Sequence, residues 1–304
     1  MSYQKVVMWG FHPQHQYDTY SHILEGFYRA YKHMGKEVEW LDRQSNIEGR
    51  KFENTLFISE HQVANTMPLH SSNFYAVHNM FGGKKETLDH LNGMNVLHYG
   101  VYTMNHYKDH GEVRWLDQFS PFYPEKRVIE ILWATDLLPH EIEANKAQAK
   151  VFNASSREIN WVGSGRRTLD AFGRAVREAG MQFNVRGSFG GPVSIEDNVL
   201  QIQRSRFSPV MVDDYQMTHP YIPCRLFKNI SYGVFPVTNS KCVHDYMGKA
   251  TVFEENGYNL FHKAERELPG KNIHELYGMM DMVGRLHTYI NRAQVMLEAA
   301  EYYG

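Results

Sequence analysis

Short apolar segments alternate with longer segments of helical periodicity along most of the chain, and this order restricts the possible folds more than any other sequence feature. Residues 5–10 form the first apolar segment, residues 19–34 repeat apolar side chains at helical spacing, and residues 37–41 form the next apolar segment. Gly35 follows the helical segment, as expected at a helix end. Strand, helix and strand in this order form a βαβ unit, from which parallel sheets are built.

The alternation runs in two series that meet near residue 140. The first series continues with predicted strands at 55–59, 74–78, 95–99 and 127–133. The second series has predicted strands at 159–163, 182–186, 207–212 and 234–238, predicted helices at 168–179, 194–204 and 222–232, and a long final helix at 273–302. Pro139 and the polar stretch 141–150 interrupt the pattern between the two series.

We therefore predict an α/β protein with two Rossmann-like, doubly wound domains that face a central cleft. The N-terminal domain is expected over residues 1–140 and the C-terminal domain over residues 141–304, with a last helix that could pack back on the N-terminal domain. Ligands of open α/β sheets bind outside the carboxyl ends of the strands. The functional residues are therefore expected in the loops at those ends.

The charge balance argues against a chain that is held to nucleic acid by its overall charge. The 304 residues include 32 Lys and Arg and 34 Asp and Glu, which gives a net charge of −2. A local basic cleft is still compatible with this total. No apolar run approaches the roughly 20 residues that span a membrane, and the N-terminus lacks a signal-peptide pattern. We expect a cytoplasmic protein without a membrane span.

Neither a disulfide framework nor a metal site is expected. Cys224 and Cys242 are the only cysteines, too few for a disulfide framework or a cysteine-based zinc site. His12 and His15 could share one helical turn, but Pro13 lies between them and no third ligand follows at a suitable spacing. The sequence also contains no Asp-x-Asp motif.

The segment Gly163-Ser164-Gly165-Arg166-Arg167 lies between a predicted strand and a predicted helix. Glycine allows the backbone to approach a ligand closely, and a helix start presents free N–H groups and a positive dipole. Two arginines add bidentate donors for phosphate oxygens. The segment indicates a diphosphate site, and an ordinary turn with a solvated arginine pair is the alternative. It matches neither the Walker A loop nor the GxGxxG pattern.

A second candidate segment, residues 218–238, begins with a proline-containing loop and continues as a predicted helix that ends at Gly233. Arg225 and Lys228 are three residues apart, so they are expected on one face of this helix. An amphipathic helix with a solvated basic face is the alternative interpretation.

This segment resembles the C-terminal signature of GT-B glycosyltransferases, Pro-x-Arg-x-Phe-Glu-x-x-x-x-Gly-x-x-Pro-Val. The matching residues are Pro223, Arg225, Phe227, Gly233, Pro236 and Val237. The resemblance is closest to the CgeB-like and exostosin-like branches, and a similar segment occurs in the DNA β-glucosyltransferases of T-even phages. Residues 159–187 fit the same pattern of strand, glycine loop, helix and strand, and residues 285–293 resemble the His-Thr-Tyr-x-x-Arg end of CgeB-like proteins.

The resemblance implies a GT-B fold and the transfer of a sugar from a nucleotide-diphosphate sugar to a hydroxyl acceptor. The expected donor is a UDP-sugar held mainly by the C-terminal domain, and the family generally needs no metal or other cofactor for the transfer. The expected donor-binding residues are Gly163, Ser164, Arg166, Arg167, Arg186, His219, Tyr221, Arg225, Lys228 and Asn229.

Lys228 departs from the family pattern, which usually has a glutamate at this position that accepts hydrogen bonds from the ribose hydroxyls. A lysine side chain donates hydrogen bonds but accepts none. Three alternatives follow: another group such as Asn229 binds the ribose, the donor is unusual, or the chain is not an active transferase.

A transfer that inverts the sugar configuration needs a base for the acceptor proton, and histidine or a carboxylate fits near neutral pH. His78 is the first candidate, because bases in related folds sit at the end of the fourth strand. Asp18 with His15 is the second, because a carboxylate can orient an imidazole. Glu60 and His61 follow the third strand. For each of these residues a structural or surface role is the alternative.

The acceptor is expected to be a glycan. The chain has 17 His and 19 Tyr residues, many of them in predicted N-terminal loops, where aromatic rings could stack on sugars and imidazoles could bind hydroxyls; compositional drift is the alternative. A nucleic-acid acceptor, as in a DNA-base glycosyltransferase, fits the balanced charge less well. Two other functions remain open: a non-catalytic nucleotide-sugar or glycan-binding protein, and a sugar-nucleotide epimerase.

Overall fold

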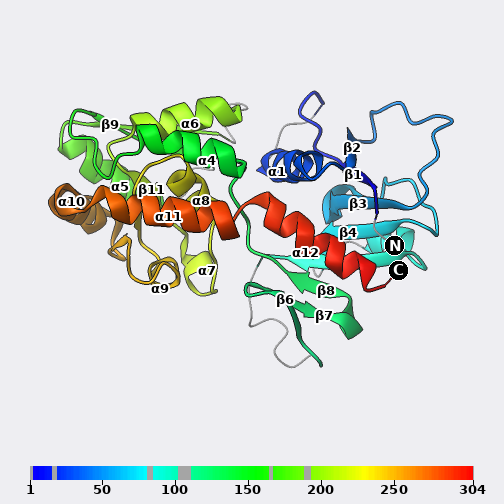
Figure 1. The fold of residues 1–304 in the computed structure, drawn as a ribbon. Helices are drawn as coiled ribbons and strands as arrows, with labels where there is room; N and C mark the ends of the chain where they lie inside the picture. Colours follow the sequence, from blue (N-terminus) through cyan, green and yellow to red (C-terminus); the bar gives the residue numbers. More distant parts are fainter. Residues whose placement is uncertain are drawn as a thin grey trace. The chain divides into compact units, whose positions relative to one another are not determined.

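The computed structural model describes residues 3–15, 19–80, 85–101, 111–163, 167–187 and 193–303 (Figure 1). It divides into two compact units, of which the first combines Met1–Leu132 with Tyr289–Gly304 and the second is Trp133–Thr288. The sequence predicts a boundary between residues 140 and 141. The structure places it at Leu132, and the C-terminal segment returns to the first unit.

The prediction of one helix over residues 273–302 is wrong, because two helices occupy this segment: α11 (Ile273–Leu286) and α12 (Tyr289–Glu301). The backbone of His287, at φ −131° and ψ 38°, leaves the helical conformation. Its imidazole is fully buried and stacks on Phe227 at 4.2 Å between ring centroids, and its carbonyl accepts a hydrogen bond from the Thr135 N–H. These tertiary contacts outweigh the helical propensity of the segment.

The first unit contains an eight-stranded sheet in the order β2-β1-β3-β4-β5-β8-β7-β6. Its strands are β1 (Lys5–Trp9), β2 (Glu37–Leu41), β3 (Thr55–Glu60), β4 (Phe74–His78), β5 (Asn95–Gly100), β6 (Arg114–Asp117), β7 (Ser120–Tyr123) and β8 (Val128–Glu130). The six neighbouring strands β2, β1, β3, β4, β5 and β8 are parallel, which confirms the predicted parallel sheet. The antiparallel strands β6 and β7 were not predicted, and the strand expected at 127–133 is confined to β8.

The helices of the first unit are α1 (Thr19–His33), α2 (His61–Ala64), α3 (Lys85–His90) and α12. Helix α12 packs beside α1 (Figure 1), with Phe27 and Tyr289 at 4.9 Å between ring centroids. Arg292 is fully buried, and its Nε donates a hydrogen bond to the Leu132 carbonyl at 2.7 Å. These contacts attach the end of the chain to the unit in which the chain begins.

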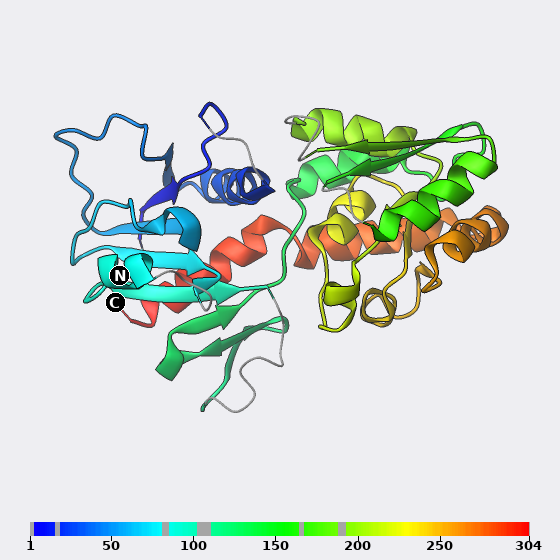
Figure 2. The ribbon, with the colours of Figure 1, turned by 180° about the vertical axis from the view of Figure 1, so that it is seen from behind.

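The second unit is also an α/β unit, but its sheets are smaller than the sheet of the first unit (Figure 2). The parallel strands β9 (Glu158–Val162) and β10 (Gln182–Arg186) form one pair, and β11 (Ser208–Val210), β12 (Pro236–Thr238) and β13 (Val252–Phe253) form a parallel three-stranded sheet. The helices, besides α11, are α4 (Pro139–Asn145), α5 (Thr168–Glu178), α6 (Ile195–Arg204), α7 (Asp214–Met217), α8 (Cys224–Ser231), α9 (Lys241–Tyr246) and α10 (Gly257–Glu267).

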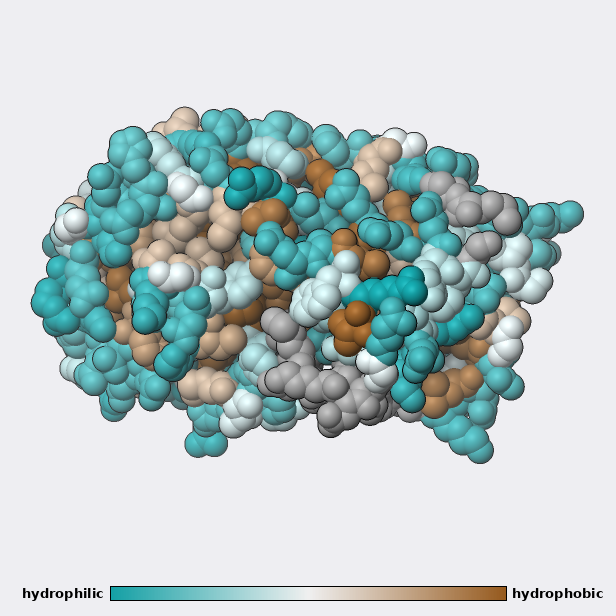
Figure 3. Space-filling view, turned by 60° about the horizontal axis from the view of Figure 1, so that its bottom comes forward, coloured by the Kyte–Doolittle hydropathy of each residue, from teal (hydrophilic) through white to brown (hydrophobic). Residues whose placement is uncertain are grey.

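The segments of this unit that were predicted as strands and helices form those elements, with ends that differ by a few residues. Ser194 caps α6, because its side chain accepts a hydrogen bond from the Asp197 N–H at 3.0 Å. Across the described residues, no helix is long and apolar enough to cross a membrane. The face in Figure 3 is largely hydrophilic, with apolar residues gathered in a few patches.

Candidate functional site

The carboxyl end of β9 brings together Gly163 and Arg225, two of the predicted donor-binding residues. Nε and Nη2 of Arg225 donate to the Val162 carbonyl at 3.3 and 3.2 Å. The guanidinium carbon lies 3.5 Å from the centroid of the Trp161 ring, a distance at which a cation–π attraction operates. Gly163 has φ +141°, and its N–H donates to the Arg186 carbonyl at 2.7 Å. Arg225 is thus held beside Gly163, the first residue of the segment that was predicted to bind phosphate.

Gly163 cannot be replaced by a larger residue without moving Arg225, since a Cβ at this position would lie 2.1 Å from Arg225 Nη2. We expect Gly163→Ala to combine this clash with backbone strain of about 1–3 kcal/mol. Gly180→Ala is the matched control, because Gly180 also has a positive φ, +72°, but has open space around its Cβ position. Thermal unfolding of both variants measures the difference. If the two lose equal stability, the proximity of Arg225 has no energetic consequence.

The other predicted donor-binding residues do not all join Gly163 and Arg225. Ser164 and Arg166 lie outside the described residues. Arg167 is exposed at the start of α5, and Arg186 is exposed at the end of β10, where it lines a polar cavity of about 310 Å³. His219 and Tyr221 are partly exposed in the loop between α7 and α8.

Asn229 is a buried residue of α8 whose Nδ2 donates to Ser208 Oγ on β11, so this contact holds the helix to the sheet. The ring of His219 is tilted against the ring of the exposed Tyr215, with 4.5 Å between the centroids, and its Nδ1 lies 2.9 Å from the Tyr215 carbonyl. Tyr215 was not a predicted site residue. Tyr215 could have been selected from the sequence, because it follows β11 at the carboxyl end of the strand.

Lys228 pairs with Asp136, a residue that the sequence places near the domain boundary. Lys228 Nζ lies 2.6 Å from Asp136 Oδ2, and the Tyr232 hydroxyl donates to Asp136 Oδ1 at 2.7 Å. All three side chains are buried, with 8% of Lys228 and 3% of Asp136 exposed. Lys228 therefore forms a buried ion pair, whereas Arg225 on the same helix contacts the end of β9.

Three titratable side chains lie at the carboxyl edge of the sheet in the first unit. Glu60 on β3 is in register with His78 on β4, and Glu130 ends β8. All three are buried. The Nδ1 atom of His78 lies 3.1 Å from the Tyr20 hydroxyl. Burial, together with the charge of His61, lowers the pKa of His78 to about 3, so this imidazole is neutral at physiological pH.

The low pKa of His78 makes the stability of the protein depend on pH. The unfolded chain takes up the proton near pH 6.5, whereas the folded protein does so near pH 3. The contribution of the neutral His78 to the free energy of unfolding is therefore complete above pH 6.5. Below that pH it falls by about 1.4 kcal/mol per pH unit. We expect wild type to lose about 2 kcal/mol more than His78→Gln between pH 7 and pH 5, as measured by urea unfolding. Identical losses would contradict this assignment.

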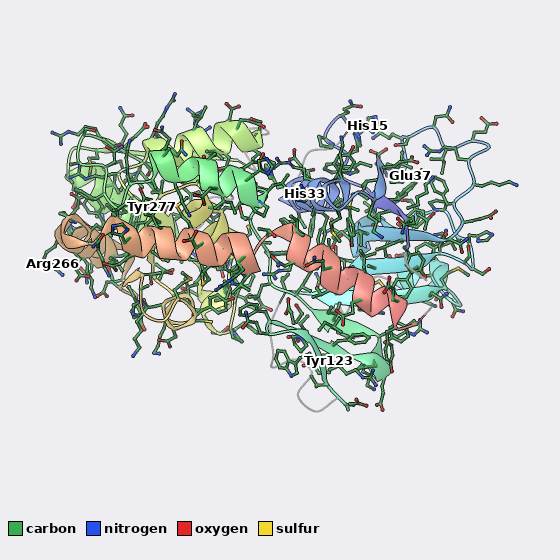
Figure 4. All side chains as sticks on the ribbon, in the orientation of Figure 1. His15, His33, Glu37, Tyr123, Arg266 and Tyr277 are labelled. Carbon is green, nitrogen blue, oxygen red and sulfur yellow. The ribbon has the colours of Figure 1, made fainter. Side chains whose placement is uncertain are left out.

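His15, the other predicted histidine, contacts Asp42 in the structure. Its Nδ1 lies 2.7 Å from Asp42 Oδ2, and Asp18, its predicted partner, lies outside the described residues. Figure 4 labels His15 in the loop after β1. Burial alone would raise the pKa of Asp42, but hydrogen bonds from His15, from the Gln44 N–H and from Ser45 lower it below its ordinary value. Sequence reasoning missed Asp42, although this residue directly follows β2.

The histidines, cysteines and carboxylates of the described residues nowhere gather into a group of three or more that could hold a metal ion.

No family model and no curated protein sequence matches the chain. Solved structures do match it, among them two glycosyltransferases that match over nearly its whole length. The catalytic domain of starch synthase IV from Arabidopsis thaliana, bound to ADP and acarbose, is 10% identical with a TM-score of 0.57 and 99% coverage of each chain. The DNA-modifying enzyme β-glucosyltransferase, studied with and without uridine diphosphoglucose, is 10% identical with a TM-score of 0.50 and 98% coverage of each chain. The chain has the GT-B fold, which confirms the predicted fold class.

Proposed function

We propose that the protein is a glycosyltransferase that moves a sugar from a nucleotide-diphosphate sugar to a hydroxyl acceptor. The observation that carries this proposal is the placement of Arg225 beside Gly163 at the carboxyl end of β9. This edge is where open α/β sheets bind their ligands, and a fixed guanidinium suits a diphosphate. Both matched structures are described as bound to, or studied with, a nucleotide or a nucleotide sugar.

The donor is expected to lie against the second unit. Arg225 provides the central phosphate contact, and Arg167 and Arg186 stand exposed at the ends of neighbouring elements. Lys228 is not expected to bind the ribose, because its ammonium group is paired with Asp136. Tyr221, His219 and the backbone carbonyls near them supply other polar groups for the ribose and the base. We propose a UDP-sugar as the donor and a glycan as the acceptor, with no metal required for the transfer.

A thermal-shift screen over UDP-, GDP-, ADP-, dTDP- and CMP-sugars tests the donor site. A ligand at 100 times its dissociation constant stabilises the folded state by about 2.7 kcal/mol, so the correct nucleotide is expected to raise the melting temperature clearly. The same nucleotide should leave Arg225→Ala almost unshifted. If none of the nucleotides shifts the wild-type protein, the donor site assigned to Arg225 does not exist.

Release of the nucleotide diphosphate separates a transferase from a non-catalytic binding protein on the same fold. A transferase releases it in proportion to the acceptor supplied, and EDTA leaves the rate unchanged if no metal takes part. A binding protein gives the thermal shift without release. An epimerase changes the sugar while the nucleotide stays attached. Parallel assays with oligosaccharides and with duplex DNA identify the acceptor class.

A further inference from the structure

Glu60 and His61 form a carboxylate–imidazole pair where β3 ends and α2 begins. The Oε1 atom of Glu60 contacts His61 Nδ1, and the Oε2 atom accepts a hydrogen bond from the Gln62 N–H at 2.6 Å. The Thr87 hydroxyl donates to the His61 carbonyl at 3.1 Å. One oxygen of the carboxylate and the backbone carbonyl of the histidine therefore accept hydrogen bonds, and the other carboxylate oxygen lies against the imidazole.

The imidazole of His61 has a buried side and an exposed side. Nδ1 is buried against Glu60, which is itself 1% exposed, whereas 14% of the His61 side chain is exposed. Within the described part of the chain, no hydrogen bond involves Nε2 of His61. Because the two nitrogens lie on different sides of the ring, the reachable part of His61 is the side that carries Nε2.

This orientation suits proton removal. A carboxylate next to Nδ1 favours the tautomer with the proton on Nδ1, which leaves the lone pair of Nε2 free to accept another proton. The same carboxylate then stabilises the imidazolium ion that forms, as in the histidine–carboxylate pairs of hydrolases. Glu60 is thus placed to position His61.

His78 lacks these properties. It is 5% exposed, and its Nδ1 faces the Tyr20 hydroxyl. Its low pKa means that a proton taken up at this ring would be held weakly. These observations favour a neutral, positioning role for His78 beside the residue that accepts the proton.

His15 and Asp42 make a contact similar to that of His61 and Glu60, but at a different place in the sheet. His15 follows β1 and His61 follows β3, but the two carboxylates differ in place: Asp42 follows β2, the outer strand of the sheet, whereas Glu60 ends β3, which lies between β1 and β4. In the order β2-β1-β3, the strand order reverses between β1 and β3, and ligands of open α/β sheets bind at such switch points. His61 stands at one side of this point.

We propose that His61, positioned by Glu60, is the base that takes the proton from the acceptor hydroxyl; this rests on the proposed function of sugar transfer. The acceptor proton passes to His61 Nε2, and the acceptor oxygen forms a bond to the anomeric carbon. The bond from that carbon to the diphosphate oxygen breaks, and its electron pair leaves with the nucleoside diphosphate. A single displacement of this kind inverts the configuration of the transferred sugar.

The test compares His61→Ala with His15→Ala and His33→Ala in one transfer assay. His33 is exposed at the end of α1, as labelled in Figure 4, and serves as the histidine control. We expect His61→Ala to lower kcat by about 10²- to 10⁴-fold with unchanged donor Kd, and His33→Ala to keep wild-type kcat. Glu60→Gln should lower kcat while leaving the donor KM unchanged.

Three results would overturn the role of His61: full turnover by His61→Ala, loss of turnover in His15→Ala alone, or retention of the donor's anomeric configuration in the product. Nitrogen NMR of the wild-type protein tests the geometry without any activity. The proton is expected on Nδ1 of His61, and a proton on Nε2 in the neutral ring contradicts the proposal. Failure of the proposed function itself differs from these results, because the wild-type protein would then bind no nucleotide sugar.

Discussion

Replacing Asp136 by alanine is expected to lower the free energy of unfolding by about 3–5 kcal/mol, the usual cost of removing one partner of a buried ion pair. The ammonium group of Lys228 would lose the carboxylate that lies 2.6 Å away while it stays buried. The hydroxyl of Tyr232 would lose its acceptor on the same carboxylate. Urea unfolding of the wild-type and variant proteins measures the effect.

The matched control for Asp136→Ala removes both charges. Because the double variant Asp136→Ala with Lys228→Met leaves no buried charge unpaired, it is expected to be more stable than Asp136→Ala alone. Together with Lys228→Met alone, these two variants complete a double-mutant cycle that gives the coupling between the two residues. If Asp136→Ala lowers the free energy of unfolding by less than about 1 kcal/mol, the pair behaves like an exposed ion pair. That result would contradict its burial.

Replacing Arg225 by alanine is expected to weaken donor binding by about 2–3 kcal/mol, or about 30- to 150-fold in Kd. The guanidinium is already fixed by the Val162 carbonyl and the Trp161 ring, so little side-chain freedom is lost when it meets a phosphate. Calorimetric titration with the nucleotide identified in the thermal-shift screen measures the change.

Arg225→Lys is the control for charge. Lysine keeps the positive charge but loses the planar fork that contacts Val162 and Trp161, so its affinity is expected between those of the wild-type protein and Arg225→Ala. Circular dichroism of the variants checks that the fold is intact. Equal donor affinity in all three proteins would remove Arg225 from the donor site.

The sequence predicted the strand cores well because their patterns are local. The strands β2, β4 and β10 have the predicted bounds, since each is a short run between clear turn signals. The hairpin β6–β7 was missed, because it is an edge feature whose Arg114–Asp117 strand is largely polar. The end of α11 was missed because it depends on the stacking of His287 with Phe227, two residues far apart in the sequence.

In the candidate site too, the residues within a local motif could be predicted, whereas contacts between residues far apart in the sequence could not. Gly163 and Arg225 were found from motifs, and the structure brings them into contact. The partners Asp136 of Lys228 and Asp42 of His15 were not predicted as partners, because side chains from separate elements meet only after folding. Glu60 and His61 are adjacent in the sequence. Their pairing could have been suspected there, but burial and ring orientation needed the structure.

The most direct test of sugar transfer is the mass of the acceptor after incubation with the donor that stabilises the protein most. We predict that an acceptor in an oligosaccharide library gains the mass of one sugar residue, with an equal amount of nucleoside diphosphate released, and that Arg225→Ala forms much less of both products at a donor concentration below its Kd. A protein that binds the nucleotide sugar while no acceptor gains mass and no diphosphate is released would contradict the account.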